Sequence, residues 1–540
     1  MSDFFQQFMP ARVFRATQPV RNILAKGILA RGTWANGIFA TAAASVAVLG
    51  MASCGSNLRP TTTPIVGTGP ASQPQELAFV ISTPSPTAQG IGTVIDYSGD
   101  TVMATAPIGP GPSLFTMNTG TEAWTLNGDG TVSNIPVNTT LQNKNVFLTT
   151  LNPIPTTGQF AGQDPIVALF DGSVGLFALD DNLNELDVLN GSPAAAFKLV
   201  IPVDQTPVTM IGVAAATRYY SVSQMIPYGT ACNTSPSTVG VTGMADGIET
   251  TTYTVSSHIP VGVCPVYAVG TPDTRRVYVL NRGSDTISVI NSQNNALDST
   301  CPPPTGCVNQ NGQTYFGHPT LPLSTTAVTN TGITPQNGTS GMPATAGPVY
   351  AEYNAATEQL VVSDYDGGTI SIIDVSLDEY GNDSATFGTT YTVKVGNNPA
   401  AVTVLADGSR AYVANQTDST VSIVTLASHT IENTLAVTGH PRTVVSTQNS
   451  LFGKVYVVSP DSDVISIIRT DQDILSTTVL VQGNAIDVRT TSADGIAGNL
   501  NLVSRLPGAG QPCFLPLAEL PAASITTASC KYQSTSQLTP

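Results

Sequence analysis

The amino-acid sequence predicts an all-β fold, and two observations lead to that prediction. Hydrophobic residues make up 41% of the 540 residues and charged residues only 10%, while Thr, Ser, Asn, Gly (48) and Pro (39) supply much of the rest. This mixture favours many short strands joined by turns over long helices. The second observation is repetition: RAYVANQTDSTVSIVTL at 410–426 is followed 44 residues later by KVYVVSPDSDVISIIRT at 454–470.

Each of these segments predicts a strand, a polar turn and a second strand. The clear copies have their first strand core at 278–281, 360–363, 412–415 and 456–459. The second strand begins eight residues after the first in three copies and nine residues after it in the copy at 360. Fainter copies have their cores at 79–82, 124–127, 168–171 and 220–223. Pro207, Pro265 and Pro399 each stand 13 residues ahead of a copy.

A repeat of 44 to 58 residues with four short strands is typical of β-propeller blades. A blade is a small sheet with two apolar faces, and it can bury both only against neighbouring blades. We therefore expect a single propeller of seven or eight four-stranded blades, and the count of copies gives eight. The first copy leaves little room for a strand ahead of it, so we expect residues 485–490 to complete the first blade from the C-terminal side.

The clear copies also resemble a known family of repeats. In 412–415, Tyr-Val-Ala-Asn, and in 369–374, Thr-Ile-Ser-Ile-Ile-Asp, the chain is similar to the YVTN-type (YncE-like) β-propeller repeats. The likeness is strong over 259–300 and 347–481 and weaker over 74–258. The resemblance implies a propeller, commonly of seven blades.

The first 53 residues predict a signal peptide. Residues 1–36 carry five Lys or Arg and one acid, Asp3, and an uncharged apolar stretch follows at 37–53. Seventeen residues are short for a membrane span, which needs about 20. The stretch ends in Met51-Ala52-Ser53-Cys54, which resembles the lipobox of bacterial lipoproteins. The resemblance implies that Cys54 is acylated and becomes the first residue of the mature chain. An ordinary signal peptide with a chance cysteine, or a short anchor helix, stays open as an alternative.

The lipobox-like ending also predicts where the protein resides. Gly55 follows the cysteine, and an Asp that would suggest retention in an inner membrane is absent there. We expect the bacterial cell envelope, with the chain anchored in the outer membrane on its periplasmic or surface face. Several acyl chains would anchor it stably.

The remaining segments outside the repeats have distinct compositions. Residues 54–75 are rich in Pro, Thr, Ser and Gly and predict a flexible tether to a propeller at 76–505. A similar composition at about 300–346 indicates an insertion between two copies. Residues 506–540 are expected to form a C-terminal tail.

The cysteine count agrees with an oxidising compartment. Without Cys54, six cysteines remain, and six allow 15 pairings. Their spacing suggests three pairs: Cys232 with Cys264, Cys301 with Cys307, and Cys513 with Cys530. A zinc site is the alternative, but no Cys-x-x-Cys occurs and the histidines do not cluster with the cysteines.

Charge argues against nucleic acid as a partner. The formal net charge is −16, and only 20 Lys and Arg are spread over the chain, whereas phosphate binding needs clustered basic residues. The acidity is interpreted as an aid to solubility. A face that collects cations is the alternative.

Few residues predict chemistry. Hydrolase, phosphate-loop, zinc-protease and EF-hand motifs are absent from the sequence, so we expect no catalytic residues, no metal and no cofactor. His440 and Arg442 lie in TGHPRTV, where the chain enters an innermost strand, and they are the candidates for contact with a ligand at the channel mouth. His258 is interpreted as a strand-end residue. The Asp-Gly turns at 127–130 and 364–368 are interpreted as structural, with weak calcium binding as the alternative.

Two classes of function fit this sequence. The first is a non-catalytic binding or scaffold module, held at the membrane by its lipid, for an envelope protein, a peptide or a glycan. The alternative is a propeller enzyme of the lactonase or lyase type, because such enzymes share the scaffold, although a fold does not by itself carry function. The enzyme would bring His440, Arg442 and acids from different repeats together.

Overall fold

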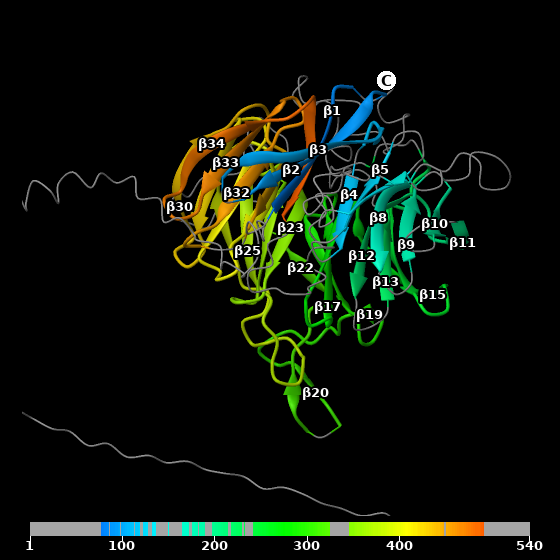
Figure 1. Ribbon diagram of the computed structural model, residues 1–540. Helices are drawn as coiled ribbons and strands as arrows, with labels where there is room; N and C mark the ends of the chain where they lie inside the picture. Colours follow the sequence, from blue (N-terminus) through cyan, green and yellow to red (C-terminus); the bar gives the residue numbers. More distant parts are fainter. Residues whose placement is uncertain are drawn as a thin grey trace, which may run out of the picture. The chain divides into compact units, whose positions relative to one another are not determined.

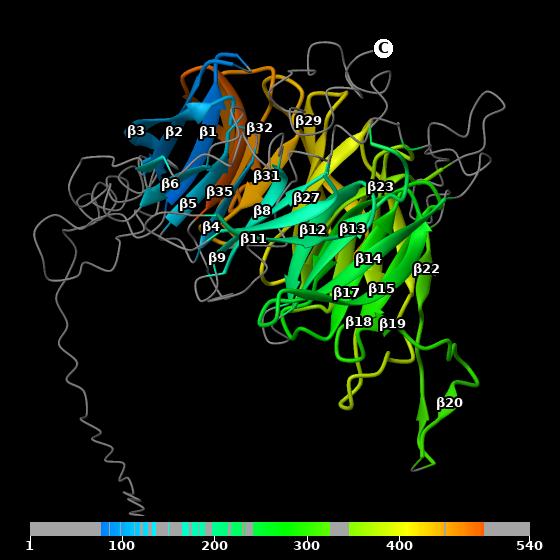
Figure 2. The same ribbon diagram turned by 90° about the vertical axis from the view of Figure 1, so that its right-hand side faces the viewer.

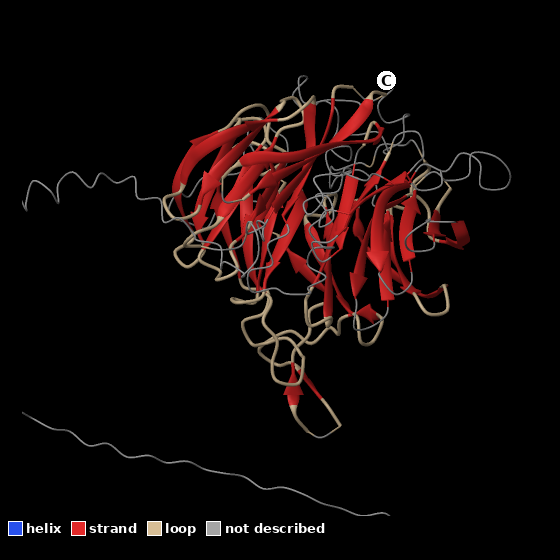
Figure 3. Cartoon of the chain, viewed as in Figure 1, coloured by secondary structure: helices blue, strands red, loops and turns tan. Residues whose placement is uncertain are grey.

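The structure is a computed structural model that describes residues 77–490 apart from several gaps. The undescribed positions within this range are 86, 98, 113, 119–121, 128–131, 137–148, 151–164, 172–174, 182, 190–196, 214–217, 229–231, 233–240, 311, 324–344 and 448–449. In the described part, the regular structure consists of strands without helices (Figure 3). This confirms the predicted all-β class. Over the same residues, no helix has the length and apolar character to cross a membrane.

The described strands form eight antiparallel sheets of four or more strands, and consecutive strands along the chain are neighbours in nearly every sheet. The first sheet combines β1 (Leu77–Thr83), β2 (Gln89–Asp96) and β3 (Thr101–Pro110) with the last strand, β35 (Asn484–Thr490). The second contains β4 (Leu114–Asn118), β5 (Glu122–Leu126), β6 (Val132–Pro136) and β7 (Thr149–Thr150). The third contains β8 (Pro165–Asp171), β9 (Gly175–Asp180), β10 (Glu185–Leu189) and β11 (Phe197–Pro202). The fourth contains β12 (Pro207–Val213), β13 (Arg218–Ser223), β14 (Thr242–Glu249) and β15 (Thr254–Val263).

The other four sheets contain the clear sequence copies. The fifth contains β16 (Pro265–Gly270), β17 (Arg276–Asn281), β18 (Thr286–Asn291), β19 (Ala296–Leu297) and β22 (Thr320–Pro322). The sixth contains β23 (Pro348–Asn354), β24 (Gln359–Asp364), β25 (Thr369–Asp374) and β26 (Thr390–Lys394). The seventh contains β27 (Pro399–Val404), β28 (Arg410–Asn415), β29 (Thr420–Thr425) and β30 (Thr430–Ala436). The eighth contains β31 (Thr443–Ser446), β32 (Lys454–Val458), β33 (Val464–Arg469) and β34 (Ile474–Leu480).

One edge strand of each sheet lies beside the corresponding strand of the next sheet. These innermost strands are β35, β4, β8, β12, β16, β23, β27 and β31, and each packs against its successor in this order, with β31 also packing against β35 (Figures 1 and 2). Within the first sheet, β35 pairs antiparallel with β1, with Val80 opposite Val488. Sheets that pack in this way, together with the similar structure of NirN described below, give the chain a β-propeller-type fold.

The hydrophobic core lies between successive sheets. One continuous cluster of buried side chains extends from Val208 in β12 to Ile468 in β33. It includes Tyr278 and Tyr412, which begin the four-residue strand cores at 278–281 and 412–415; we call this recurring core the phrase. The middle strands alternate side chains toward both neighbouring sheets, which explains why strands such as β17 are buried at every position. Burial of one large apolar side chain contributes about 1.5–3 kcal/mol. A single sheet has no neighbour against which to bury these side chains and so cannot gain this stabilisation. The repeated segment must therefore occur several times along the chain.

The last residue of the phrase has a defined structural task. The Nδ2 atom of Asn281 donates to the hydroxyl groups of Thr286 and Ser288, and its Oδ1 accepts the N–H of Gly262 at 3.0 Å. Asn415 repeats this arrangement in the seventh sheet. A Cβ added to Gly262 would lie 2.5 Å from the Asn281 side chain, so the crossover from the preceding sheet needs glycine there. The asparagine therefore fixes both its own hairpin and the neighbouring sheet.

Two copies of the phrase lie elsewhere than predicted. Residues 168–171 belong to the innermost strand β8, whereas the other copies lie on the second strand, so the true counterpart in the third sheet is β9. In the sixth sheet the register places Asp364, not Ser363, opposite Thr369. The extra residue counted between the strands therefore disappears, and Asp364 takes the position of Asn281. The faint copy was misplaced because several apolar tetrapeptides in one sheet look alike, and the clear copy at 360–363 was offset by one residue.

The insertion interrupts the fourth strand of the fifth sheet. Strand β19 pairs with the C-terminal end of β18, and β22 pairs with its N-terminal end, with Ile287 opposite Leu321. Between them lies a hairpin of β20 (Cys307–Val308) and β21 (Thr314–Tyr315) that projects away from the sheets (Figures 1 and 2). We call residues 299–317 the arm.

Candidate functional site

His440 and Arg442 flank Pro441 just before the innermost strand β31, but they face different partners. The backbone N–H of His440 donates to Oδ1 of Asp461 at 2.9 Å, and its Nδ1 lies 2.6 Å from Oδ2 of the same carboxylate. Asp461 lies in the turn between β32 and β33, so both residues belong to the eighth sheet. One carboxylate thus fixes the ring and the backbone of a partly exposed histidine.

Arg442 is buried, and a carboxylate of another sheet acts on it electrostatically. Burial lowers the pKa of Arg442 to about 10, and the carboxylate of Asp487 in β35 opposes that effect. Burial in turn raises the pKa of Asp487 to about 6, and Arg489 and Arg442 hold it from rising further. Nη1 of Arg489 donates to Oδ1 of Asp487 at 2.9 Å. Arg442, Asp487 and Arg489 are stabilised in their ionised forms because each buried charge has an opposite charge nearby.

The innermost strands β16 and β23 extend this group. The rings of Tyr267 and Tyr350 are stacked with centroids 4.8 Å apart. Burial raises the pKa of the Tyr267 hydroxyl well above its ordinary value; Tyr350 and Glu352 add to the rise, while the positive charge of Arg489 opposes it. We call the group the inner cluster; its members are Tyr267, Tyr350, Glu352, Arg442, Asp487 and Arg489. Two guanidinium groups and two carboxylates in it balance to a net charge near zero, and the ion pair between Arg489 and Asp487 lies within β35.

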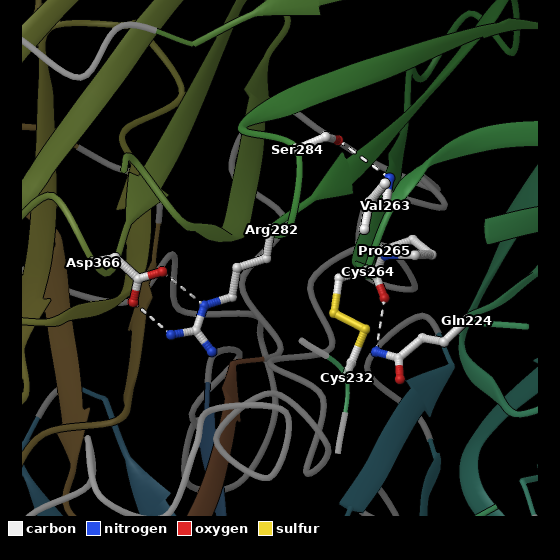
Figure 4. Close-up of a disulfide and its surroundings, with 8 residues drawn as sticks. All are labelled: Gln224, Cys232, Val263, Cys264, Pro265, Arg282, Ser284 and Asp366. Atoms are coloured by element: carbon white, nitrogen blue, oxygen red, sulfur yellow. Dashed lines mark hydrogen bonds and ion pairs between the residues drawn. A yellow bond between two sulfur atoms is a disulfide. The ribbon is translucent and has the colours of Figure 1, made fainter. Parts of the chain in front are cut away.

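The Cys232–Cys264 disulfide lies beside the start of β16 (Figure 4). Cys264 has a positive φ of 54° directly before Pro265, and Nε2 of Gln224 donates to the Pro265 carbonyl at 3.1 Å. The bond therefore ties the segment after β13 to the first strand of the next sheet, as the spacing of these cysteines suggested. To the left of the disulfide in Figure 4, Arg282 forms a two-point ion pair with Asp366 of the sixth sheet.

The Cys301–Cys307 disulfide closes the base of the arm. The wholly buried Asp383 joins β17 to the residue that directly follows the arm. Its Oδ1 accepts a hydrogen bond from Nη2 of Arg276 at 3.2 Å, and its Oδ2 lies 2.8 Å from Nδ1 of His318. Burial and the nearby Asp298 raise the pKa of Asp383 to about 6. The arm is thus fixed to the fifth and sixth sheets while its hairpin stays exposed, with Val308 of β20 at 66%.

Other sequence-based candidates are placed as follows. Cys54, Cys513 and Cys530 lie outside the described residues. In the turn at 364–368, Asp364 accepts hydroxyl hydrogen bonds from Thr369 and Ser371, and Asp366 pairs with Arg282; these contacts are those of a structural turn.

The interpretation of His258 as a strand-end residue is wrong. His258 lies in the middle of β15, directly opposite Asp246 of β14. Its Nδ1 is within reach of two carboxylates, those of Asp246 and Asp204. Among the described residues, these three form the one group of His, Cys, Asp or Glu side chains close enough to hold a metal ion. Pro260 suggested a strand end, but proline is tolerated in an outer strand.

Sequence reasoning missed most of the inner cluster. Asp487 and Arg489 occur in the segment expected to complete the first blade, and charges within a short apolar strand were the available signal.

A basic residue two positions before the tyrosine of the repeated phrase is a separate signal, and it marks contacts between successive sheets. Arg218, Arg276, Arg410 and Lys454 occupy this position, and each contacts the turn between the third and fourth strands of the following sheet.

Comparison with known proteins shows a fold without showing a family. No family model matches the chain, and no curated protein matches it. Among solved structures, the dihydro-haem d1 dehydrogenase NirN is 12% identical, with a TM-score of 0.52 over 80% of this chain and 78% of that one. AztD from Citrobacter koseri is 13% identical, with a TM-score of 0.48 over 77% and 97%. A streptogramin B lyase is 11% identical, with a TM-score of 0.40 over 72% and 96%. The likeness to NirN supports the propeller-type fold.

Proposed function

We propose that the chain is a lipid-anchored β-propeller of the bacterial cell envelope that binds an envelope protein, a peptide or a glycan without transforming it. In this proposal each of the eight sheets is a blade, β35 closes the first blade, and Cys54 carries the lipid. The inner cluster serves as an ionic lock of the scaffold, and the arm contacts the partner.

The observation that carries the proposal is the arm. It projects from the sheets, a disulfide closes it, and buried ion pairs fix its base (Figure 1). Residues 299–351 contain no Asp, Glu, Lys or Arg, although the whole chain has a net charge of −16. A neutral surface rich in Asn, Gln, Thr and Pro can approach the anionic polymers of an envelope, whereas the acidic faces repel them. A rigid element also loses little conformational entropy when it binds.

Contacts between the eighth and first sheets support ring closure. Lys454 of β32 forms an ion pair with Asp100, in the turn between β2 and β3, and donates to the carbonyl of Tyr97 at 2.6 Å. Arg410 makes the corresponding contact with Asp473 one sheet earlier. The eighth sheet therefore meets the first as the seventh meets the eighth, which is the geometry that a closed ring requires.

A crossed experiment tests anchor and partner together. Bacteria would express the wild-type chain, Cys54→Ser, Val308→Asp or Leu480→Asp, and membrane association and captured envelope components would be measured. Leu480 is a matched control because it is 68% exposed on β34, away from the arm. We expect Cys54→Ser to lose membrane association and keep the partner, Val308→Asp to do the reverse, and Leu480→Asp to keep both. Equal capture by Val308→Asp and wild type would contradict the role of the arm.

The alternative is an enzyme of the lactonase or lyase type, and the His440–Asp461 pair is the observation that favours it. A carboxylate on Nδ1 orients an imidazole as a general base would require. Lactone turnover by the wild-type chain that His440→Ala abolishes would replace the binding proposal with this one.

A further inference from the structure

Three side chains converge on the fourth sheet from three different segments. Asp246 and His258 face each other across β14 and β15, and Asp204 lies in the crossover between β11 and β12. Nδ1 of His258 is 2.6 Å from Oδ1 of Asp246 and 3.0 Å from Oδ2 of Asp204. The N–H of Asp204 donates to Oδ2 of Asp246 at 2.7 Å, which directs Oδ1 toward the histidine.

In the third sheet Asp187 holds the position of Asp246, but it lies opposite Val200, and four other sheets have hydroxyl residues at both positions. Opposite pairs equivalent to Asp246 and His258 are Ser371 with Thr392, Ser422 with Thr434, Ser466 with Thr478 and Thr93 with Thr105. The position of Asp204 is glycine at 262 and 396, where the phrase asparagine leaves no space for a Cβ. In the fourth sheet, Ser223 replaces that asparagine and makes room for the Asp204 side chain.

The eighth sheet provides the closest internal comparison. There Thr438 and Ser459 stand where the fourth sheet has Asp204 and Ser223, and the hydroxyl of Ser459 donates to the Thr438 carbonyl at 2.6 Å. Ser223 donates in the same way to the Asp204 carbonyl at 3.0 Å. The backbone is therefore shared, and what distinguishes the fourth sheet is that three of its side chains are metal-ligating types.

The carboxylate of Asp246 lies where a cation would be favourable. Its side chain is wholly buried, and Oδ1 accepts no hydrogen bond of good geometry from the described residues, although it points at His258. The carboxylates of Asp246 and Asp204 both approach Nδ1 of His258, so a wholly buried carboxylate and a second carboxylate meet at one point. A positive ion between them would offset the burial of Asp246 and the repulsion between the two negative charges.

We propose that Asp204, Asp246 and His258 form a binding site for a divalent transition-metal ion of the zinc class. Two carboxylate oxygens and one imidazole nitrogen are a zinc donor set, and three protein ligands leave a coordination position for water. The three donor atoms lie within 4.8 Å of one another, and donors around tetrahedral zinc are about 3.3 Å apart. His258, 59% exposed, can move outward to make the space. When Nδ1 binds the ion, a neutral His258 carries its proton on Nε2 instead, and a protonated His258 also releases one proton to solvent.

This site is independent of the proposed binding role of the arm, and its expected effect is on the fold. The ion would link the crossover from the third sheet to the outer strands of the fourth, so a loaded chain should unfold at a higher temperature. Mg²⁺ prefers oxygen ligands in an octahedral arrangement and should not replace zinc here.

The test uses the full-length purified chain and ZnCl₂ as the probe, with calorimetric titration and thermal unfolding at pH 7.5. One variant copies the eighth sheet (Asp204→Thr, Asp246→Ser, His258→Thr), a second carries His258→Thr alone on the exposed side, and His429→Asn is the control histidine. We expect one saturable zinc site in the wild type and in His429→Asn, and at least about tenfold weaker binding in the other two. Zinc should raise the unfolding temperature of the wild type and of His429→Asn, but not that of the two site variants.

Three results would overturn the proposal. The first is the absence of saturable zinc binding by the wild type, which would leave His258 as an ion-pair partner alone. The second is unchanged affinity in His258→Thr, whose folding the thermal scan verifies. The third is equally tight binding of MgCl₂.

Discussion

At the residue scale, the phrase asparagine explains why the repeats are recognisable. Its amide donates to two hydroxyl groups of the following strand and accepts from a glycine of the preceding sheet, so three sequence positions are fixed by one side chain. The sixth sheet has Asp364 at this position, wholly buried, with a pKa that burial raises to about 8. A neutral carboxylic acid thus takes the place of a neutral amide.

This predicts the behaviour of Asp364→Asn. The folded-state pKa lies above the unfolded value of 3.8, so the folded state binds the proton more tightly, and its contribution to stability is complete below 3.8 and is lost as the pH rises through about 8. The asparagine variant has no proton to lose. We expect it to be more stable than wild type by about 1–3 kcal/mol at pH 8.5, with little difference at pH 4.

Urea unfolding at both pH values measures this difference. Asn415→Asp is the converse control. It should create in the seventh sheet the loss of stability with rising pH that Asp364→Asn removes in the sixth sheet. Parallel pH profiles for wild type and Asp364→Asn would contradict the account.

At the scale of elements, the two disulfides act on different parts of the structure. Cys232–Cys264 joins the fourth and fifth sheets across a separation of 32 residues, and Cys301–Cys307 closes the arm across 6. Loop-closure entropy gives about 4 kcal/mol for the first and about 2 kcal/mol for the second.

The double serine variants should therefore differ. We expect Cys232→Ser with Cys264→Ser to lower the unfolding temperature of the sheets more than Cys301→Ser with Cys307→Ser, because only the first bond joins two sheets. Differential scanning calorimetry under non-reducing conditions measures both. A larger effect of the arm disulfide would show that the arm supports the sheets.

At the scale of the whole molecule, the proposed ring depends on one strand from the far end of the chain. Strand β35 supplies the inner edge of the first sheet and two members of the inner cluster, Asp487 and Arg489. Without it, β1 would present an unpaired edge, and the first and eighth sheets would expose apolar faces.

Truncation tests the closure. A chain ending at residue 483 should aggregate or unfold well below the wild-type temperature, whereas a chain ending at residue 490 keeps every pairing of β1 and should unfold near it. Size-exclusion chromatography and thermal scans distinguish the two. Equal stability of both chains would mean that the sheets form an open array.

The sequence by itself determined the all-β class and the recurring hairpin, and it suggested the two cysteine pairs that the structure contains, because period-two apolar strands, turn residues and short cysteine spacings are local signals. It placed most copies on the correct strand, but the faint third-sheet copy and the one-residue offset of the clear copy at 360–363 were resolved only by strand register. Only the tertiary structure decided which side chains meet across sheets. Arg442 faces Asp487, and His258 faces Asp204 and Asp246, because packing of separate segments sets those contacts, and no periodicity along the chain encodes them.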